Sequence, residues 1–190
     1  MAAETNMAKG AVLITGTSTG IGRACALHLD RMGFRVFPGV RKEKDGEALK
    51  VEASDRLTPV IIDVTDTSSI AKAVEIVTET VGNDGLYGLV NNAGIAVASP
   101  LELLPLDLLE KQLRVNVIGQ IAVTQAFLPL IRKAGGRIVN ISSDNGKASW
   151  PFLGAYCASK FAMEALTDAL RMELRPFGIS VSLIEPGSIA

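Results

Sequence analysis

The residue pair with the clearest chemical meaning in the sequence is Tyr156 and Lys160. The two are four positions apart, so in a helix they lie along one face. A tyrosine with an ordinary pKa of about 10 is a poor base at neutral pH, but a neighbouring ammonium group stabilises the phenolate and lowers that pKa. In such a pair Tyr156 can take a proton from an alcohol or give one to a carbonyl. Because Tyr-x-x-x-Lys is common by chance, this interpretation depends on the residues around it.

Further polar residues are predicted to reach the same place. Ser143 precedes Tyr156 by thirteen positions and lies just after the strand predicted over 137–142. The segment 91–94, Asn-Asn-Ala-Gly, ends another predicted strand, and its small side chains let a cofactor lie against the backbone. Asn116 falls within a helical pattern, where Asn is unfavourable unless its side chain has another partner. The sequence therefore predicts a polar site built from several elements.

A glycine-rich segment follows the first apolar run and leads into a helical pattern. Glycines in this position let the backbone turn tightly and approach a pyrophosphate, and the first-turn N–H groups of the helix favour an anion. The spacing is Gly-x3-Gly-x-Gly instead of the more common G-x-G-x-x-G, and an ordinary glycine-rich turn is the alternative. The predicted dinucleotide contacts are Gly16, Thr17, Ser18, Thr19, Gly20, Ile21 and Gly22.

The end of the second apolar run bears on the choice of cofactor. An acidic residue there binds the ribose 2′-hydroxyl of NAD, whereas arginine accommodates the 2′-phosphate of NADP. This chain has Arg41 and Lys42 and no carboxylate, which favours NADP(H) with NAD(H) as the alternative. The hydroxyls of residues 17–19 are possible helpers, and solvated loop charges are the competing interpretation. Asp63, followed by Val64, is predicted to accept from the adenine amino group, or else to cap the next turn.

Short β-branched runs alternate with longer helical patterns, which implies parallel strands joined by crossover helices. The predicted strands cover 11–15, 35–40, 60–64, 86–91, 137–142 and 179–184. The predicted helices cover 20–33, 43–53, 67–81, 106–133 and 156–177. This order predicts an α/β fold, a Rossmann-like doubly wound parallel sheet in three α/β/α layers. Ligands of such sheets bind beyond the carboxyl ends of the strands, which is where every motif above falls.

Composition supports one folded domain and excludes several classes of protein. Of the 190 residues, 48% are hydrophobic and 21% are charged, which excludes a disordered or collagen-like chain. The 19 basic and 20 acidic side chains leave no broad basic surface for nucleic acid. Cys25 and Cys157 offer neither a disulfide framework nor metal-ligand spacing, so no metal site is expected.

The same features predict how the chain is organised. No uninterrupted apolar run reaches the roughly 18 residues that a membrane span needs. The first nine residues have no apolar core followed by a cleavage site, as a signal peptide would. We therefore expect a flexible tail over 1–9, one NAD(P)-binding domain over 10–190, no membrane span, no nucleic-acid partner and a cytoplasmic location.

Taken together, the motifs over residues 11–187 resemble those of the short-chain dehydrogenase/reductase family in order and spacing. The resemblance implies that Tyr156 is the acid/base, that Lys160 lowers its pKa and holds the nicotinamide ribose, and that Ser143 orients the substrate oxygen. It also implies that Asn116 supports a proton-relay water. Ser142 is the alternative serine, although the spacing to Tyr156 favours Ser143. The implied catalytic set is Asn116, Ser143, Tyr156 and Lys160, and the further implied cofactor contacts are Asn92, Ala93, Gly94, Pro186 and Gly187.

The activity that this resemblance implies is the NADP(H)-dependent interconversion of a secondary alcohol and a carbonyl, without a metal ion. Segments 86–94 and 181–187 look most like the retinol and hydroxysteroid dehydrogenase branch, which implies a hydrophobic small-molecule substrate such as a steroid or retinoid. Helices over 106–133 and 156–177 resemble those that family members pack across subunits. A homodimer or homotetramer is therefore expected.

Family members usually continue with a segment that covers the substrate, another helix and a seventh strand. This chain ends three residues after Gly187, so it resembles a member truncated after the sixth strand. Three explanations are a fragment of a longer enzyme, a natural short form and a sequence limited to ordered residues. The alternative function is a dinucleotide-binding sensor or assembly protein without turnover.

Overall fold

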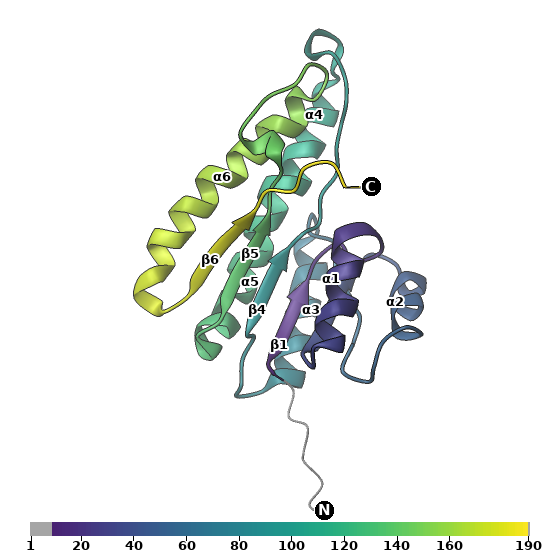
Figure 1. The fold of residues 1–190 in the computed structure, drawn as a ribbon, viewed down its shortest axis with the longest axis vertical. Helices are drawn as coiled ribbons and strands as arrows, with labels where there is room; N and C mark the ends of the chain where they lie inside the picture. The colour runs from purple at the N-terminus through teal and green to yellow at the C-terminus, as the bar shows by residue number, and fades with distance from the viewer. Residues whose placement is uncertain (1–8, 190) are drawn as a thin grey trace, which may run out of the picture.

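The computed structural model describes residues 9–189 and contains a parallel sheet of six strands with helices on both faces (Figure 1). The predicted tail over 1–9 lies outside the described residues except for Lys9. The strand order is β3-β2-β1-β4-β5-β6, so the chain builds the sheet outward from β1, first to one side and then to the other. The strands are β1 (Ala11–Ile14), β2 (Arg35–Val40), β3 (Val60–Ile61), β4 (Gly88–Asn91), β5 (Arg137–Ile141) and β6 (Ser180–Ile184). The predicted doubly wound sheet is confirmed.

The helices follow the predicted ranges to within a few residues. They are α1 (Gly20–Arg31), α2 (Glu43–Lys50), α3 (Thr67–Val81), α4 (Leu106–Leu113), α5 (Gly119–Ala134) and α6 (Gly154–Leu174). Shorter helical turns are η1 (Leu101–Leu103), η2 (Arg114–Ile118), η3 (Asp144–Gly146) and η4 (Arg175–Phe177). The strand predicted over 60–64 is shorter than expected, because β3 pairs with β2 only through Val60 and Ile61. Asp63 and Val64 therefore lie in the loop beyond it.

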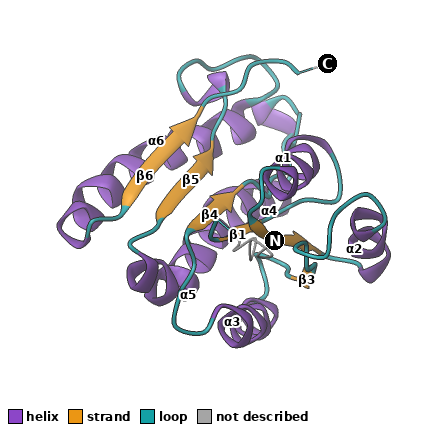
Figure 2. Cartoon of the chain, turned by 60° about the horizontal axis from the view of Figure 1, so that its bottom comes forward, coloured by secondary structure: helices purple, strands orange, loops and turns teal. Residues whose placement is uncertain are grey.

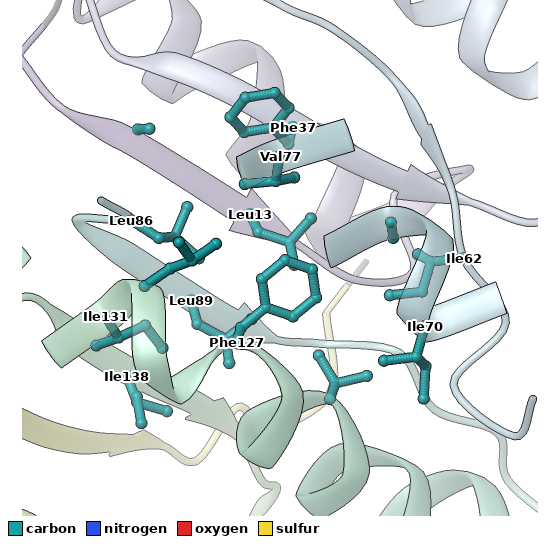
Figure 3. Packing of buried hydrophobic residues seen from close by; sticks show 14 of the residues in the cluster. Leu13, Phe37, Ile62, Ile70, Val77, Leu86, Leu89, Phe127, Ile131 and Ile138 are labelled. Atoms are coloured by element: carbon teal, nitrogen blue, oxygen red, sulfur yellow. The ribbon is translucent and has the colours of Figure 1, made fainter. Parts of the chain in front are cut away.

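One face of the sheet packs against α3, α5 and α6 and forms the larger of the two core clusters. Figure 2 places α3 and α5 together on this side. Leu13 and Leu89 of the sheet meet Val77 of α3 and Phe127 of α5, all fully buried (Figure 3). Complete burial of such a side chain stabilises the fold by about 1.5–3 kcal/mol. This layer fixes α5 and, with it, the helical segment that precedes α5.

The opposite face is divided between a packed part and an open part. Ala26 and Leu27 of α1 and Leu49 of α2 pack in the second core cluster, with side chains of β1 and β2. Farther along the sheet this face carries an apolar cavity of about 550 Å³, lined in part by Val139 and Ile184. On this face α1 and α2 therefore cover the half of the sheet that holds β1 and β2.

Elements α4, η2 and α5 form one helical run, as predicted over 106–133, but the run is not a regular α-helix. Its middle segment η2 is π-helical and contains Asn116, and single π turns of this kind are frequent at functional sites. Within the described residues, this run is the helix that is long and apolar enough to cross a membrane, with a mean hydropathy of 1.2. Here Phe127 and Ile131 are fully buried in the main core, so the run packs as a central helix of the domain.

Candidate active site

Two contiguous cavities form a groove across the carboxyl ends of the strands. The first has a volume of about 590 Å³ and extends past the ends of β1, β2 and β3 to α4. The second has a volume of about 330 Å³ and lies between the end of β5 and the start of α6. Both are lined by Ile21, Asn92, Gly94 and Ile95, so they meet at the loop that follows β4. This is the position that the topology predicts for a ligand.

The glycine-rich loop runs between β1 and α1 and is held by close backbone contacts. Gly16 has a φ of +68°, and a Cβ on it would lie 2.7 Å from Cα of Ala93. A Cβ on Gly22 would lie 2.5 Å from the Gly16 carbonyl oxygen and against the Asn92 amide. Larger residues do not fit at these two positions. The loop therefore brings its backbone to the start of α1, whose first N–H groups and positive dipole end suit a phosphate.

Side chains after β4 brace this loop from the other side. The Asn92 amide donates to the carbonyl oxygens of Thr15 and Gly16, each at 2.9 Å. The hydroxyl oxygen of Thr15 in turn accepts from the backbone N–H groups of Asn92 and Ala93, each at 3.0 Å. The predicted contacts Asn92, Ala93 and Gly94 thus line the groove, and Asn92 also holds the phosphate loop in place.

The three hydroxyl residues of the loop have different environments. Thr17 is fully buried, and its hydroxyl donates to the Gly39 carbonyl oxygen of β2 at 3.0 Å. This corrects the prediction of Thr17 as a helper toward a 2′-phosphate, because its side chain braces the loop against β2. Ser18 and Thr19 are exposed, and Thr19 lines the larger cavity.

Arg41 lines the larger cavity at the end of β2, as predicted, and is exposed. Among the described residues it has neither a salt bridge nor a side-chain hydrogen bond, so its guanidinium is available to a ligand. Lys42 does not line this cavity and occupies the N-cap position of α2. Arg41 is therefore the cation of this pair that faces the groove.

Asp63 and Val64 line the same cavity beyond β3. One carboxylate oxygen of Asp63 accepts from the backbone N–H of Thr65 at 2.9 Å and from its hydroxyl at 2.7 Å. The turn-capping role of Asp63 is thus present, and its place in the cavity wall is compatible with the adenine role as well. Motif analysis missed the charged residues that α4 and η2 add to this wall, namely Asp107, Glu110, Lys111 and Arg114.

Tyr156 and Lys160 both line the smaller cavity from the first turns of α6. The Lys160 ammonium nitrogen lies 5.6 Å from the centre of the Tyr156 ring and donates to the Ile141 carbonyl oxygen at 2.8 Å. Lys160 is only 7% exposed, and this burial lowers its pKa from 10.5 to about 8. The ammonium is therefore held beside the tyrosine ring in a largely buried place.

The two serines after β5 face different neighbours. The Ser143 hydroxyl donates to the Asp144 carboxylate at 2.8 Å and accepts from the Asn145 backbone N–H at 3.2 Å. The Ser142 hydroxyl is buried against Gly146 and has no hydrogen-bond partner among the described residues. Both residues line the smaller cavity.

Asn116 is 1% exposed and does not line either cavity of the groove. Its amide accepts from the Ile95 N–H and donates to the Ile95 carbonyl oxygen, each at 2.9 Å, and donates to the Ser159 hydroxyl at 3.1 Å. Ser159 donates in turn to the Tyr156 carbonyl oxygen at 2.6 Å. Asn116 thus ties the groove wall to α6 through these hydrogen bonds, and its role toward a proton-relay water stays a prediction.

Gln112 was missed by the sequence analysis and lies one turn before Asn116. It is fully buried, donates to the Ile95 carbonyl oxygen at 2.8 Å and accepts from the Val97 N–H at 2.8 Å. The side-chain amides of Gln112 and Asn116 together bond to the backbone N–H and C=O groups of residues 95–97, in the way that the backbone of a neighbouring strand would. The only signal in the sequence is their spacing of four, which places two amides on one helix face.

Pro186 and Gly187 line the smaller cavity beyond β6, as predicted. The Pro186 carbonyl oxygen accepts from the backbone N–H of Asp144 at 3.1 Å, which joins this segment to the turn after β5. The smaller cavity is thus enclosed by the ends of β4, β5 and β6 and by α6.

The groove fits a nicotinamide dinucleotide. At one end a backbone cradle excludes Cβ atoms beside a helix N-terminus, with the Arg41 cation nearby. At the other end a tyrosine and a buried ammonium line a separate cavity. Such a group would supply hydride chemistry, and a tyrosine beside an ammonium can transfer a proton.

Comparison with known proteins identifies the family. The family model for short chain dehydrogenase matches residues 10–190. Retinol dehydrogenase 7 of Mus musculus is 50% identical over 176 residues, 93% of this chain and 55% of that protein. 17-beta-hydroxysteroid dehydrogenase type 6 of Bos taurus is 50% identical over 178 residues, 93% of this chain and 56% of that protein. The chain thus spans about half the length of these curated relatives.

Two solved structures of dehydrogenases have the same fold as this chain. A short-chain dehydrogenase from Streptomyces avermitilis superposes with a TM-score of 0.90 at 35% identity, covering 95% of this chain and 66% of that one. A dehydrogenase/reductase from Sinorhizobium meliloti 1021 gives a TM-score of 0.88 at 32% identity, covering 96% of this chain and 73% of that one. The chain therefore belongs to the short-chain dehydrogenase family.

Proposed function

We propose that the chain provides the cofactor-binding and proton-transfer parts of an NADP(H)-dependent oxidoreductase that interconverts a secondary alcohol and a carbonyl. The observation that carries the proposal is the buried Lys160 ammonium 5.6 Å from the Tyr156 ring, at one end of a dinucleotide-sized groove. Hydride transfer is the chemistry that a bound nicotinamide supplies.

The residues of the smaller cavity divide the remaining work. In alcohol oxidation the Tyr156 phenolate takes the hydroxyl proton, and in carbonyl reduction the Tyr156 hydroxyl gives its proton to the developing alkoxide. The Lys160 ammonium stabilises the phenolate in both directions. Ser143 is placed to orient the substrate oxygen, with Asp144 and Asn145 fixing its hydroxyl. Gln112 and Asn116 hold the wall of the cavity in position.

The substrate class follows from the relatives and from the cavity wall. The relatives are called retinol dehydrogenases and 17-beta-hydroxysteroid dehydrogenases, and we assign this chain a hydrophobic alcohol or carbonyl compound of the retinoid or steroid type. The apolar lining residues Ile95, Ala96 and Ile189 suit such a molecule.

The choice of NADP(H) rests on Arg41. Its exposed guanidinium at the end of β2 has no partner among the described residues, and the place where NAD-binding chains carry a carboxylate has none. A guanidinium pairs with phosphate through two parallel hydrogen bonds, so the same groove is expected to bind NADPH more tightly than NADH.

Assembly and location are part of the proposal. Large apolar side chains are exposed on α4, η2 and α6, namely Leu106, Ile118, Phe161 and Met172. This exposure supports a homodimer or homotetramer. Sedimentation velocity at micromolar concentration tests this, and a purely monomeric species would contradict it. We place the protein in the cytoplasm without a membrane span, which fractionation of cells that express it would check.

The test of the activity is nicotinamide absorbance in the presence of NADP(H) or NAD(H) and a panel of steroids, retinoids and simple ketones. Turnover in the wild type and its loss in Tyr156→Phe are expected. Turnover that survives the substitution would refute the proton-transfer role. Tight cofactor binding without turnover on any substrate would instead support a dinucleotide sensor.

A further inference from the structure

One carboxylate beside the catalytic pair has no role in the mechanism above. Glu164 follows Lys160 by four residues on α6, so the two side chains lie along the same face. The Glu164 side chain is only 15% exposed. One carboxylate oxygen lies 2.6 Å from the Lys147 ammonium nitrogen, whereas the other is buried with no hydrogen-bond partner among the described residues. A buried carboxylate with an idle oxygen is costly, which calls for a reason.

The surroundings of Glu164 connect it with the turn that carries the catalytic serine. A Cβ on Gly146 would lie 2.8 Å from the idle oxygen of Glu164 and 2.7 Å from the Ser142 hydroxyl oxygen. The absence of a side chain at Gly146 thus lets η3 pack directly on Glu164. Glu164 therefore lies immediately behind the smaller cavity, between α6 and the turn that begins at Ser143.

Burial and the Glu164 carboxylate act on the Lys160 ammonium in opposite ways. Burial lowers the pKa of Lys160, and the negative charge of Glu164 acts in the opposite direction. The exposed Lys147 ammonium contacts Glu164 and also lies 3.4 Å from Glu185, so it competes for the same carboxylate from the solvent side. On the elements that border Lys160, the titratable and charged groups are Tyr156 and Glu164 on α6, Asp144 and Lys147 at and after η3, and Glu185 after β6.

We propose that Glu164 is a positioning residue that keeps Lys160 protonated beside Tyr156, and that Lys147 limits this effect by sharing the carboxylate. The inference rests on the proposed function, because the role of Lys160 in catalysis is part of that proposal. The charge of Lys160, however, is a property of the chain that can be measured without substrate or turnover.

The experiment is competitive acetylation of the purified chain with acetic anhydride across a pH series, with mass spectrometry of the peptide that contains Lys160. Glu164→Gln is expected to lower the titration midpoint of Lys160 by about one pH unit. Glu185→Gln is the matched control, because it removes the same charge from Lys147 and leaves Glu164 in place. Its Lys160 midpoint is expected to move much less, because Glu185 lies against Lys147 and acts on Lys160 only through it. An unchanged midpoint in Glu164→Gln, or an equal shift in Glu185→Gln, would overturn the proposal.

A second variant acts from the surface and keeps the test valid if Glu164→Gln does not fold. Lys147 is 57% exposed, so Lys147→Met is expected to fold. By leaving Glu164 to Lys160 alone, it should raise the midpoint of Lys160. A merely structural role of Glu164 predicts no such opposite shifts, and a lowered or unchanged midpoint in Lys147→Met would count against the inference.

Turnover separates this inference from the proposed function. If the wild type is active, Glu164→Gln should lose activity mainly in kcat, with the pH profile displaced in the same direction as the Lys160 midpoint, and Glu164→Asp should restore part of it. If no substrate is turned over but the midpoints shift as described, the proposed function fails and the assignment of Glu164 stands. Turnover with unshifted midpoints gives the reverse result.

Discussion

The two ends of the groove are built in different ways. At the phosphate end the shape is made by backbone, with Gly16 packed against Ala93 and Gly22 against the Gly16 carbonyl. At the catalytic end it is made by buried polar side chains, with Lys160 on the Ile141 carbonyl and Gln112 and Asn116 on residues 95–97. A site shaped by close backbone contacts is disrupted by added atoms, which do not fit. A network of buried side chains is disrupted when one polar group is removed, because its partners then lose their hydrogen bonds. The comparison predicts which kind of substitution damages each end.

The largest effect is expected at the catalytic end. Tyr156→Phe removes one oxygen atom and with it the proton donor and acceptor, so kcat should fall by about 10²- to 10⁴-fold. The phosphate end is untouched, so NADPH affinity measured by fluorescence titration should stay within about twofold of the wild type. Weakened NADPH binding of the same size as the loss of kcat would show that the two ends are not separable.

The buried ammonium should reveal itself in stability as a function of pH. The pKa of Lys160 is about 8 in the folded chain against 10.5 for an ordinary lysine, so between these values the unfolded chain binds more protons. Stability from this group therefore rises with pH across that window, by about 3 kcal/mol in total, and is lowest below pH 8. Urea unfolding at several pH values should show this rise in the wild type and not in Lys160→Met. A parallel pH dependence in both chains would contradict the buried charge.

The network at the catalytic end is tested by Gln112→Leu, which keeps the approximate volume and removes both hydrogen bonds. The Ile95 carbonyl then keeps one partner and the Val97 N–H loses its own, so the free energy of unfolding should fall by about 2 kcal/mol. Activity should fall through kcat, because the cavity wall loosens. Gln125→Leu on the exposed side of α5 is the matched control and should change little. Equal losses in the two variants would remove the argument for a wall held by amides.

The phosphate end is tested by adding a single methyl group. Gly22→Ala places a Cβ against the Gly16 carbonyl and the Asn92 amide, so NADPH should bind about 30-fold more weakly. Gly20→Ala is the control within the same loop, because a Cβ there has nothing within 4 Å, although its φ of +59° carries some strain. Isothermal titration should therefore rank Gly22→Ala well below Gly20→Ala. The opposite ranking would mean that conformation, not space, governs the loop.

The smallest effect concerns selectivity and not the shape of either end. Arg41→Asp should lower the ratio of NADPH to NADH affinity by about tenfold or more, because a charge-assisted hydrogen bond is replaced by repulsion. Lys42→Asp makes the same change of charge one residue farther from the cavity and should have a smaller effect. An unchanged ratio in Arg41→Asp would remove the argument for NADP(H).

Local patterns were sufficient for most of the fold. Residues 11–14 and 35–40 are apolar enough to be read as strands covered on both faces, and the alternation with helical segments predicts parallel pairing. The strand over 60–64 was overestimated, because Val60 and Ile61 pair with β2 and the last backbone hydrogen bond to β2 is that of Ile62 to Val40. The π-helical turn at 114–118 was not predicted; in the structure it contains Asn116, whose amide bonds to Ile95 on another segment.

The sequence alone was sufficient to predict the family and to propose the chemistry of the site. Both motifs are local: Tyr156 and Lys160 are one helical turn apart, and the glycines lie at the start of α1. Such motifs can be interpreted from the sequence without the structure. Only the tertiary structure decided that the Thr17 hydroxyl bonds to β2, that Asn116 holds the wall without lining the groove, and that Glu164 is buried against Gly146 of η3. These roles depend on partners distant in sequence, and burial, which sets the pKa of Lys160, exists only once the sheet and α6 have packed together.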